Sequence, residues 1–205
     1  MMFITALLTA SFASFVSGIR GFELPCSAVS GTPCRCPFGT DYSESVTTAI
    51  IGATAADVGK LTNDFFNPLW AGLDPFILQG PDDSPGLSIR ELNLSTSVGT
   101  YSFSELLTFR FVFPDGTFEQ KYEQKGEVSY RSGNGSFSGH WVTLRGDRIF
   151  QNETLVRLSD YACQTGHPID FASNHESALK NATSILAAAG KIYGVNTNPE
   201  SVQSF

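Results

Sequence analysis

The sequence predicts an α+β fold in which a curved antiparallel β-sheet wraps around one long C-terminal helix and encloses a cavity. Residues 41–52 have the composition of a strand and lead directly into one short helical segment. Segments with strand-like alternation, separated by turn residues, fill the middle of the chain, and a long helical segment follows at residues 168–194. Few arrangements bury the apolar faces of elements in this order. The short helix is expected to close the open end of the sheet.

The first 18 residues, MMFITALLTASFASFVSG, are predicted to be a secretory signal peptide. They contain no charged residue, are apolar through the middle and end in small residues near Gly18. A membrane anchor is the alternative, but the apolar run is shorter than the ~18–20 residues that cross a bilayer. The sequence therefore predicts a protein that is secreted or resides in the secretory-pathway lumen, with no stable membrane span.

Four cysteines fit an oxidising compartment, namely Cys26, Cys34, Cys36 and Cys163. Three pairings are possible, and a bridge between Cys34 and Cys36 would be strained by its short span. We therefore expect one local bridge from Cys26 and one long bridge to Cys163. Residues 19–40 are interpreted as an N-terminal arm held by these bridges.

Composition and motifs argue against several classes of function. The net charge of −7 and the lack of a basic cluster disfavour nucleic acid as a partner. The three histidines show no metal-ligand spacing, so no metal is expected; they are His140, His167 and His175. The sequence has neither a phosphate-binding Gly-rich loop nor a nucleophile elbow, and no cofactor is expected.

Sequons for N-glycosylation occur at four asparagines, Asn93, Asn134, Asn152 and Asn181. In a secreted chain they predict a glycoprotein in which each occupied site faces solvent. If Asn152 faces outward, the odd-numbered positions of the strand that follows, including Arg157, point inward.

The short helix is predicted to begin after Thr54, which can act as its N-cap, with Asp57 placed three residues on as in a capping box. Asn67–Pro68 is predicted to end it, because the residue before proline disfavours the helical conformation. The aromatic side chains at this break are expected to lie at the mouth of the cavity, as a lid or wall.

The middle of the chain is predicted to form antiparallel strands at 87–92, 101–113, 117–124, 127–132, 136–144 and 153–163. Pro114-Asp115-Gly116 predicts a tight hairpin turn. In the strand that follows, one face is charged, so the other is expected to look inward; its residues are Phe118, Gln120, Tyr122 and Gln124. Two aromatic rings and two amides suit a cavity wall better than a dry core, because buried amides need partners.

The last helix is predicted to span 168–194, with a face rich in small residues that allows close approach. Residues 195–205 are predicted to be a flexible tail. The strand at 41–52, the helix segment "I-x-A-x-A-A-D-V-x-K-L" and the following "D-F-F-N-P-L-W" resemble the start of Bet v 1-like domains, also called START-like or polyketide-cyclase-like. The resemblance covers residues 41–194 and implies a helix-grip fold around a ligand cavity.

A narrower resemblance concerns function. In length and layout the chain is similar to secreted fungal members of this superfamily that act as cofactor-free hetero-Diels–Alderases, joining a tropolone quinone methide to a humulene-type sesquiterpene. This resemblance implies a cyclase or pericyclase whose partner is a lipophilic small molecule. The alternative is a secreted carrier of a sterol or terpenoid, with the same cavity and no turnover.

Candidate site residues follow from the idea of an apolar cavity with a few fixed donors. The candidate catalytic residues are Arg110, Arg157 and Tyr122. The candidate ligand-binding residues are Phe66, Trp70, Arg90, Phe109, Gln120 and Trp141. Both faces of 101–113 are mostly apolar, so the face that lines the cavity stays open; Arg110 is a donor only if the even-numbered face points inward, and otherwise it extends from the outer face.

Overall fold

The structure is a computed structural model that describes residues 36–96, 99–126, 128–129, 135–166 and 168–204. The predicted signal peptide, the arm up to residue 35, Cys26, Cys34 and Asn134 lie outside the described residues. No helix among the described residues is long and apolar enough to span a membrane.

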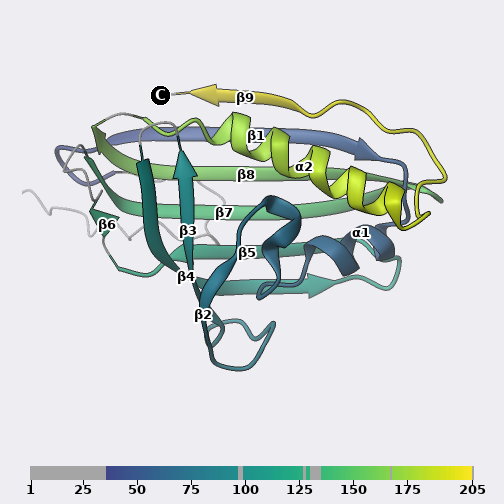
Figure 1. The fold of residues 1–205 in the computed structure, drawn as a ribbon, viewed down its shortest axis with the longest axis horizontal. Helices are drawn as coiled ribbons and strands as arrows, with labels where there is room; N and C mark the ends of the chain where they lie inside the picture. The colour runs from purple at the N-terminus through teal and green to yellow at the C-terminus, as the bar shows by residue number, and fades with distance from the viewer. Residues whose placement is uncertain (1–35, 97–98, 127, 130–134, 167, 205) are drawn as a thin grey trace, which may run out of the picture.

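One antiparallel sheet organises the described chain (Figure 1). Its strands are β1 Asp41–Ile51, β2 Pro75–Gln79, β3 Ile89–Thr96, β4 Gly99–Val112, β5 Phe118–Gln124, β6 Val128–Ser129, β7 Gly135–Phe150, β8 Glu153–Gly166 and β9 Glu200–Ser204. The spatial order is β2-β3-β4-β5-β7-β8-β1-β9, with β6 on β7. Successive hairpins place most neighbours side by side, and β1 closes against β8.

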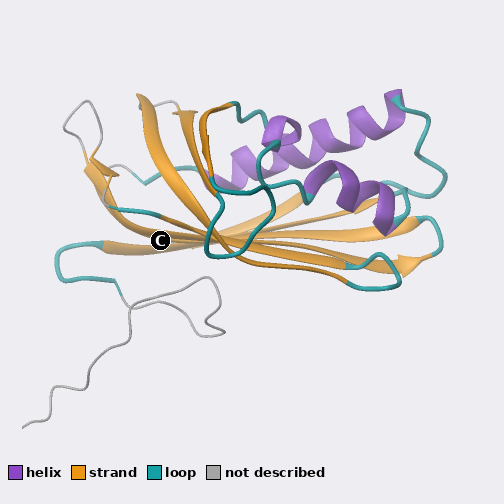
Figure 2. Cartoon of the chain, turned by 90° about the horizontal axis from the view of Figure 1, so that it is seen from below, coloured by secondary structure: helices purple, strands orange, loops and turns teal. Residues whose placement is uncertain are grey.

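The helices lie together on one face of this sheet (Figure 2). They are α1 Ala55–Thr62, the short 3-10 helix η1 Pro68–Ala71 and α2 Phe171–Ala188. At one end of the sheet the strands bend up beside the helices. The predicted helix-grip architecture is therefore confirmed.

Several predicted element boundaries differ from the structure, and three of the differences concern the helices and the C-terminal end. The first helix ends at Thr62 with Asn63 as its C-cap, and Pro68 instead begins η1, a first-turn position that suits proline because it needs no N–H there. Helix α2 ends at Ala188 and Gly190 follows with φ +67°, so the predicted helix is too long. Residues 195–205 are not simply a flexible tail, because β9 pairs with β1.

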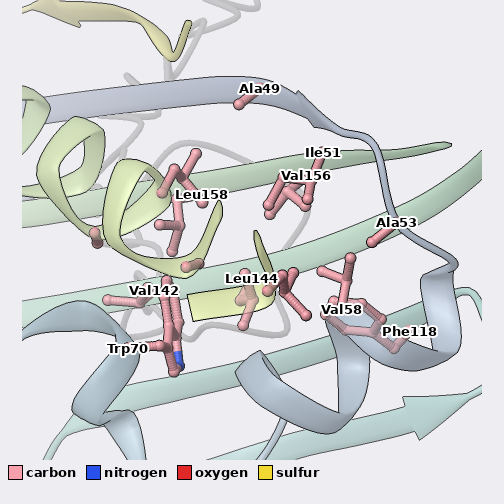
Figure 3. Packing of buried hydrophobic residues seen from close by; sticks show 14 of the residues in the cluster. Ala49, Ile51, Ala53, Val58, Trp70, Phe118, Val142, Leu144, Val156 and Leu158 are labelled. Carbon is pink, nitrogen blue, oxygen red and sulfur yellow. The ribbon is translucent and has the colours of Figure 1, made fainter. Parts of the chain in front are cut away.

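The core fills the space between the helices and the inner face of the sheet (Figure 3). Thr54 caps α1 as predicted, its hydroxyl accepting from the Asp57 N–H at 3.1 Å. Because α1 begins directly after this cap, Val58 in its first turn is fully buried beside Phe118. In β5 the residues Phe118, Gln120 and Tyr122 are buried while their neighbours are more exposed, which confirms the predicted inward face for these three residues. Gln124, at the end of the strand, is only half-buried.

A β-bulge in β4 explains why its inward face was not decidable from alternation. Leu107 is opposite Tyr122 and Arg110 is opposite Gln120, and the register shifts between Leu107 and Phe109. The odd-numbered face therefore points inward before the bulge and the even-numbered face after it.

The predicted long bridge to Cys163 is confirmed, and its partner is Cys36. Their Cα atoms lie 5.3 Å apart although 127 positions separate them in sequence. The bridge ties the segment before β1 to β8 at one end of the sheet.

Gly146 in β7 is expected to tolerate no side chain. It lies opposite Phe118 in the register, and a Cβ there would be 2.2 Å from that ring. Gly146→Ala should lower the free energy of unfolding by about 1–3 kcal/mol, because the core must shift to relieve the overlap. Urea denaturation tests this, and the penalty should shrink in a Phe118→Leu background, where the ring is absent. A Gly146→Ala variant as stable as the unsubstituted protein would contradict this packing.

Candidate functional site

A cavity of about 70 Å³ lies between η1, the first half of α2 and the inner face of the sheet. Most of its lining is apolar: Trp70, Ala71, Leu73, Leu94, Phe103, Val142, Leu158, Phe171 and Ala178. Its polar lining residues are Tyr122, His140, Asp160, Asn174 and His175. The cavity is smaller than the ~300–1,000 Å³ of typical ligand pockets, so a large ligand requires η1 and α2 to move apart.

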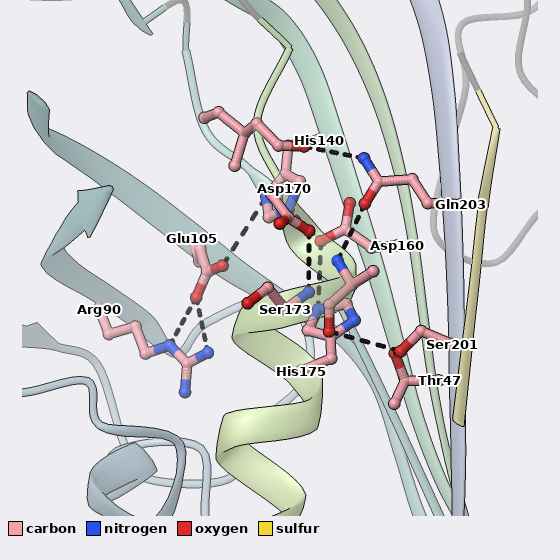
Figure 4. A network of polar contacts seen from close by, with 12 residues as sticks. Thr47, Arg90, Glu105, His140, Asp160, Asp170, Ser173, His175, Ser201 and Gln203 are labelled. Atoms are coloured by element: carbon pink, nitrogen blue, oxygen red, sulfur yellow. Dashed lines mark hydrogen bonds and ion pairs between the residues drawn. The ribbon is translucent and has the colours of Figure 1, made fainter. Parts of the chain in front are cut away.

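A chain of buried ionisable side chains crosses this region (Figure 4). His140 Nε2 and Asp160 Oδ2 are 2.8 Å apart, and His175 Nε2 on α2 lies 3.6 Å from the same oxygen. On the other side of His140, its Nδ1 is 4.0 Å from Glu105 Oε1. Glu105 in turn holds Arg90 Nε and Nη2, each at 2.6 Å. Strands β3, β4, β7 and β8 and helix α2 thus each contribute one member.

Arg90 is fixed from several directions. Its Nη1 donates to the Phe65 carbonyl at 2.6 Å, and its guanidinium lies 4.4 Å from the centroid of the Phe65 ring and 4.7 Å from that of Tyr122. Arg90 and Glu105 are both almost fully buried. Such a fully held guanidinium is suited to positioning Tyr122 and Glu105 rather than to reaching a ligand.

Burial and pairing together set the protonation of the cluster. Burial by itself lowers the pKa of His140, but the carboxylates of Asp160 and Glu105 outweigh it and raise the pKa above its ordinary value. Burial by itself raises the pKa of Asp160, but His140 and His175 outweigh it and hold the pKa below its ordinary value. Burial, reinforced by Glu105, raises the pKa of Tyr122 well above its ordinary value, so its hydroxyl keeps its proton.

Two buried atoms of this cluster have no hydrogen-bond partner among the described residues. They are Asp160 Oδ1 and His175 Nδ1, and both residues line the cavity. A buried polar atom without a partner costs about 1–3 kcal/mol. A ligand with a polar group at this end of the cavity would supply the missing contacts.

The stability of the protein is expected to peak in mildly acid solution. The raised folded pKa of His140 stabilises the fold below its unfolded pKa of ~6.5, and that contribution is lost as the pH rises through the folded value. The lowered folded pKa of Asp160 stabilises the fold above 3.8, and that contribution is lost as the pH falls through the folded value. The free energy of unfolding should therefore be highest between pH ~4 and ~6.5.

Urea denaturation at pH 5.5 and 8.5 tests this expectation. The unsubstituted protein should lose stability between these values, and His140→Gln should remove most of the difference, because Gln cannot titrate. An equal pH dependence in both proteins would assign the effect to other groups.

The structure brings several predicted site residues to this region. Tyr122 lines the cavity from the wall formed by β5, and Trp70 lines it from η1. Arg90 and Gln120 are buried on the inner face behind the lining, and Gln120 Nε2 has no partner among the described residues. Phe66 packs half-buried against the core.

Seven of the nine predicted site residues are not in the cavity lining. Arg90, Gln120 and Phe66 lie near it, as described above, whereas Arg157, Phe109, Trp141 and Arg110 lie elsewhere. Arg157 is exposed, because the even-numbered residues of β8 are the ones that point inward. The prediction took the direction from Asn152, which lies in the β7–β8 turn and therefore does not fix the alternation of β8. Phe109 lies after the bulge on the outer face, below Lys121 Nζ. Trp141 is also on the outer face, where its ring covers Gly139.

The Arg110 side chain points inward, but its contacts are with the end of α1 and with Asp83. Its Nε donates to the Asn63 carbonyl at 3.0 Å, and its Nη2 pairs with Asp83 at 2.7 Å. These contacts fix the end of α1 against β4, so Arg110 does not touch the cavity next to α2.

The described sequons differ in their surroundings. Asn93 is exposed on β3, and Asn152 is partly exposed in its turn. Asn181 is exposed on α2, yet its Nδ2, the atom that would carry a glycan, donates to the Trp70 carbonyl at 2.9 Å. Glycosylation of these residues remains a prediction.

Sequence reasoning selected none of Glu105, His140, Asp160 and His175 as a site residue. One signal was available in β8, where Asp160 shares a face with Val156, Leu158 and Ala162. A carboxylate on an apolar strand face needs a buried partner. The partners come from β7 and α2, which only the folded topology places beside it.

Fold and site define a single-sheet, helix-grip protein with a small, mostly apolar cavity. The family model described as a START domain matches residues 42–204, and the chain belongs to that family. This match includes β9 and so extends past the predicted domain end at residue 194. No curated protein sequence matches the chain.

Solved structures share the fold at low sequence identity. An aromatase/cyclase, Zhui, from a Streptomyces species has a TM-score of 0.51 and 11% identity, covering 76% of this chain and all (100%) of that one. An uncharacterized protein from Rhizobium leguminosarum has a TM-score of 0.50 and 15% identity, covering 73% of this chain and 97% of that one. At these identities the likeness concerns the fold alone.

Proposed function

We propose that the protein is a cofactor-free cyclase for a lipophilic secondary metabolite, acting on its substrate inside the cavity between η1 and α2. The reaction we propose is a hetero-Diels–Alder addition that joins an electron-poor partner, such as a tropolone quinone methide, to a sesquiterpene alkene. The observation that carries the proposal is the buried pair of His140 and Asp160 at one end of an apolar cavity.

A cycloaddition of this kind places modest demands on the protein. New C–C and C–O bonds form as π bonds are used, and no proton or electron has to be supplied. Apolar walls that hold two partners face to face lower the entropic part of the barrier by several kcal/mol, up to ~7–11. A donor on the carbonyl oxygen of the electron-poor partner lowers the barrier further.

The polar end of the cavity offers such a donor in Tyr122, whose hydroxyl keeps its proton. His175 Nε2 lies near Asp160, so Nδ1 is the ring atom left for a ligand, and it accepts a hydrogen bond when the imidazole is neutral. His140 and Asp160 hold this end in place through β7 and β8, so their role is to position His175 and to keep the local charge balanced. Arg110 and Arg157, which the sequence favoured as donors, have no part in this proposal.

The fold is compatible with cyclisation, since the Zhui aromatase/cyclase shares it. A cavity of about 70 Å³ cannot hold two such partners at once. The proposal therefore includes movement of η1 away from α2, where one side-chain hydrogen bond joins Asn181 to Trp70.

The mainly apolar lining also suits a carrier of a sterol or terpenoid, which would bind its ligand and release it unchanged. Buried charged groups cost desolvation free energy, and a carrier has no need of them, so we favour the enzyme.

One experiment separates the two functions. The secreted protein is incubated with a lipophilic extract of the organism that produces it, followed by native mass spectrometry and chiral chromatography. New or enantiomerically enriched products would support the cyclase. A metabolite that binds and is recovered unchanged would support the carrier and overturn the cyclase.

A further inference from the structure

A second cavity, of about 260 Å³, lies between α1 and the β4–β5 hairpin. Its lining residues are Ala55, Ala56, Gly59, Lys60 and Asn63 of α1 and Arg110, Val112, Gly116 and Phe118 of the hairpin. None of these residues lines the cavity next to α2. The proposed cyclase chemistry therefore does not account for it.

Asn63 gives this cavity a specific polar feature. The residue is 1% exposed, yet neither Nδ2 nor Oδ1 of its carboxamide has a hydrogen-bond partner among the described residues. Its backbone is fixed on both sides, since its N–H donates to the Gly59 carbonyl and its carbonyl accepts from Arg110 Nε. A fixed, buried carboxamide without partners at a cavity is suited to bind a polar group of a ligand.

The charges around the cavity indicate the sign of that group. Arg110 is paired with Asp83 at 2.7 Å, and Asp57 is paired with Lys191 at 3.2 Å. Lys60 lines the cavity, is exposed, and has no ion-pair partner among the described residues. The cavity thus offers one positive charge that has no ion pair of its own and lies one helical turn after Asp57, in a protein whose net charge is −7.

The rest of the lining is apolar and has room. Ala55, Val112 and Phe118 supply apolar walls, and Gly59 packs closely against the Phe118 ring, from which a Cβ at this position would lie only 2.9 Å. The ligand that matches such a site has an apolar body and one anionic oxygen group.

We propose that this cavity binds a short monocarboxylate, such as a medium-chain fatty acid. One carboxylate oxygen accepts a hydrogen bond from Asn63 Nδ2, and the carboxylate pairs with Lys60. The alkyl chain lies against Val112 and Phe118. The site is separate from the cyclase cavity, so both can be filled at once.

Octanoate is the probe, titrated into the secreted protein by isothermal calorimetry and by NMR of the Asn63 side-chain amide. We expect saturable binding and a shift of that amide signal. Lys60→Met should weaken octanoate about threefold, as expected for a partly exposed ion pair, and Ala56→Phe, which fills the cavity from an exposed position, should weaken it at least about tenfold.

Two controls make the test specific. Lys180→Met removes an exposed lysine on α2, and Ala178→Leu fills the other cavity; both should leave octanoate affinity unchanged. Loss of binding in Ala178→Leu but not in Ala56→Phe would place the acid in the cyclase cavity and overturn the proposal. The absence of saturable octanoate binding, or an unshifted Asn63 amide signal at saturation, would also overturn it.

Discussion

Replacement of Asp160 by Asn is expected to lower the free energy of unfolding by about 3 kcal/mol, the lower end of the cost of breaking a buried ion pair. Asp160 is 2% exposed, and its Oδ2 lies 2.8 Å from His140 Nε2 and 3.6 Å from His175 Nε2. Asn keeps the shape of the side chain and removes its charge. Protonated His140 then loses its carboxylate partner at 2.8 Å and keeps the longer contact with Glu105, at 4.0 Å.

The double variant Asp160→Asn/His140→Gln provides the matched control. Removing both charges leaves no unpaired ion, so a large part of the lost stability should return. Urea denaturation of the single and double variants at pH 5.5 measures the coupling. Additive losses in the double variant would show that the two side chains do not act as a pair.

Removal of the Cys36–Cys163 bridge is expected to have the largest effect on stability. The bridge closes a loop of 127 positions, for which chain-entropy reasoning gives a stabilisation of about 5 kcal/mol. The variant Cys36→Ser/Cys163→Ala removes both thiols and avoids disulfide exchange at this site. We expect a lower urea midpoint and a denaturant slope that is equal or steeper, because the unfolded chain without the bridge is less compact.

The control is the unsubstituted protein, compared with the double variant under reducing conditions. Once all disulfides are reduced, the unsubstituted protein should approach the stability of the double variant. A double variant as stable as the oxidised, unsubstituted protein would contradict the assignment of the bridge as a major restraint.

Much of the fold could be predicted from the sequence, because helix caps, turns and the inward faces of strands are determined by residues that lie close together in the chain. The helix cap at Thr54, the turn at 114–116 and the inward face of β5 follow from propensity and alternation over a few residues. The C-terminal end of the chain was harder. Strand β9 has only five residues and gains its stability from β1, which sequence spacing does not reveal.

The site was less predictable than the fold, for two physical reasons. A single bulge in β4 reverses the inward face within one strand, which separates Phe109 from the cavity. The buried cluster joins His140, Asp160 and His175 from β7, β8 and α2. Neither the bulge nor the contact among these three side chains produces a pattern at fixed spacing in the sequence.

The most direct test of the proposed function compares two substitutions on the same helix. Ala178 lines the cavity on α2, and Ala187 is exposed further along it. Product formation is measured by chiral chromatography with the substrates identified in the producer's extract. We expect Ala178→Leu to reduce the rate at least about tenfold, because misplaced partners lose the entropic advantage of the cavity, while Ala187→Leu keeps the unsubstituted rate. Equal rates for the two variants would contradict a reaction inside this cavity.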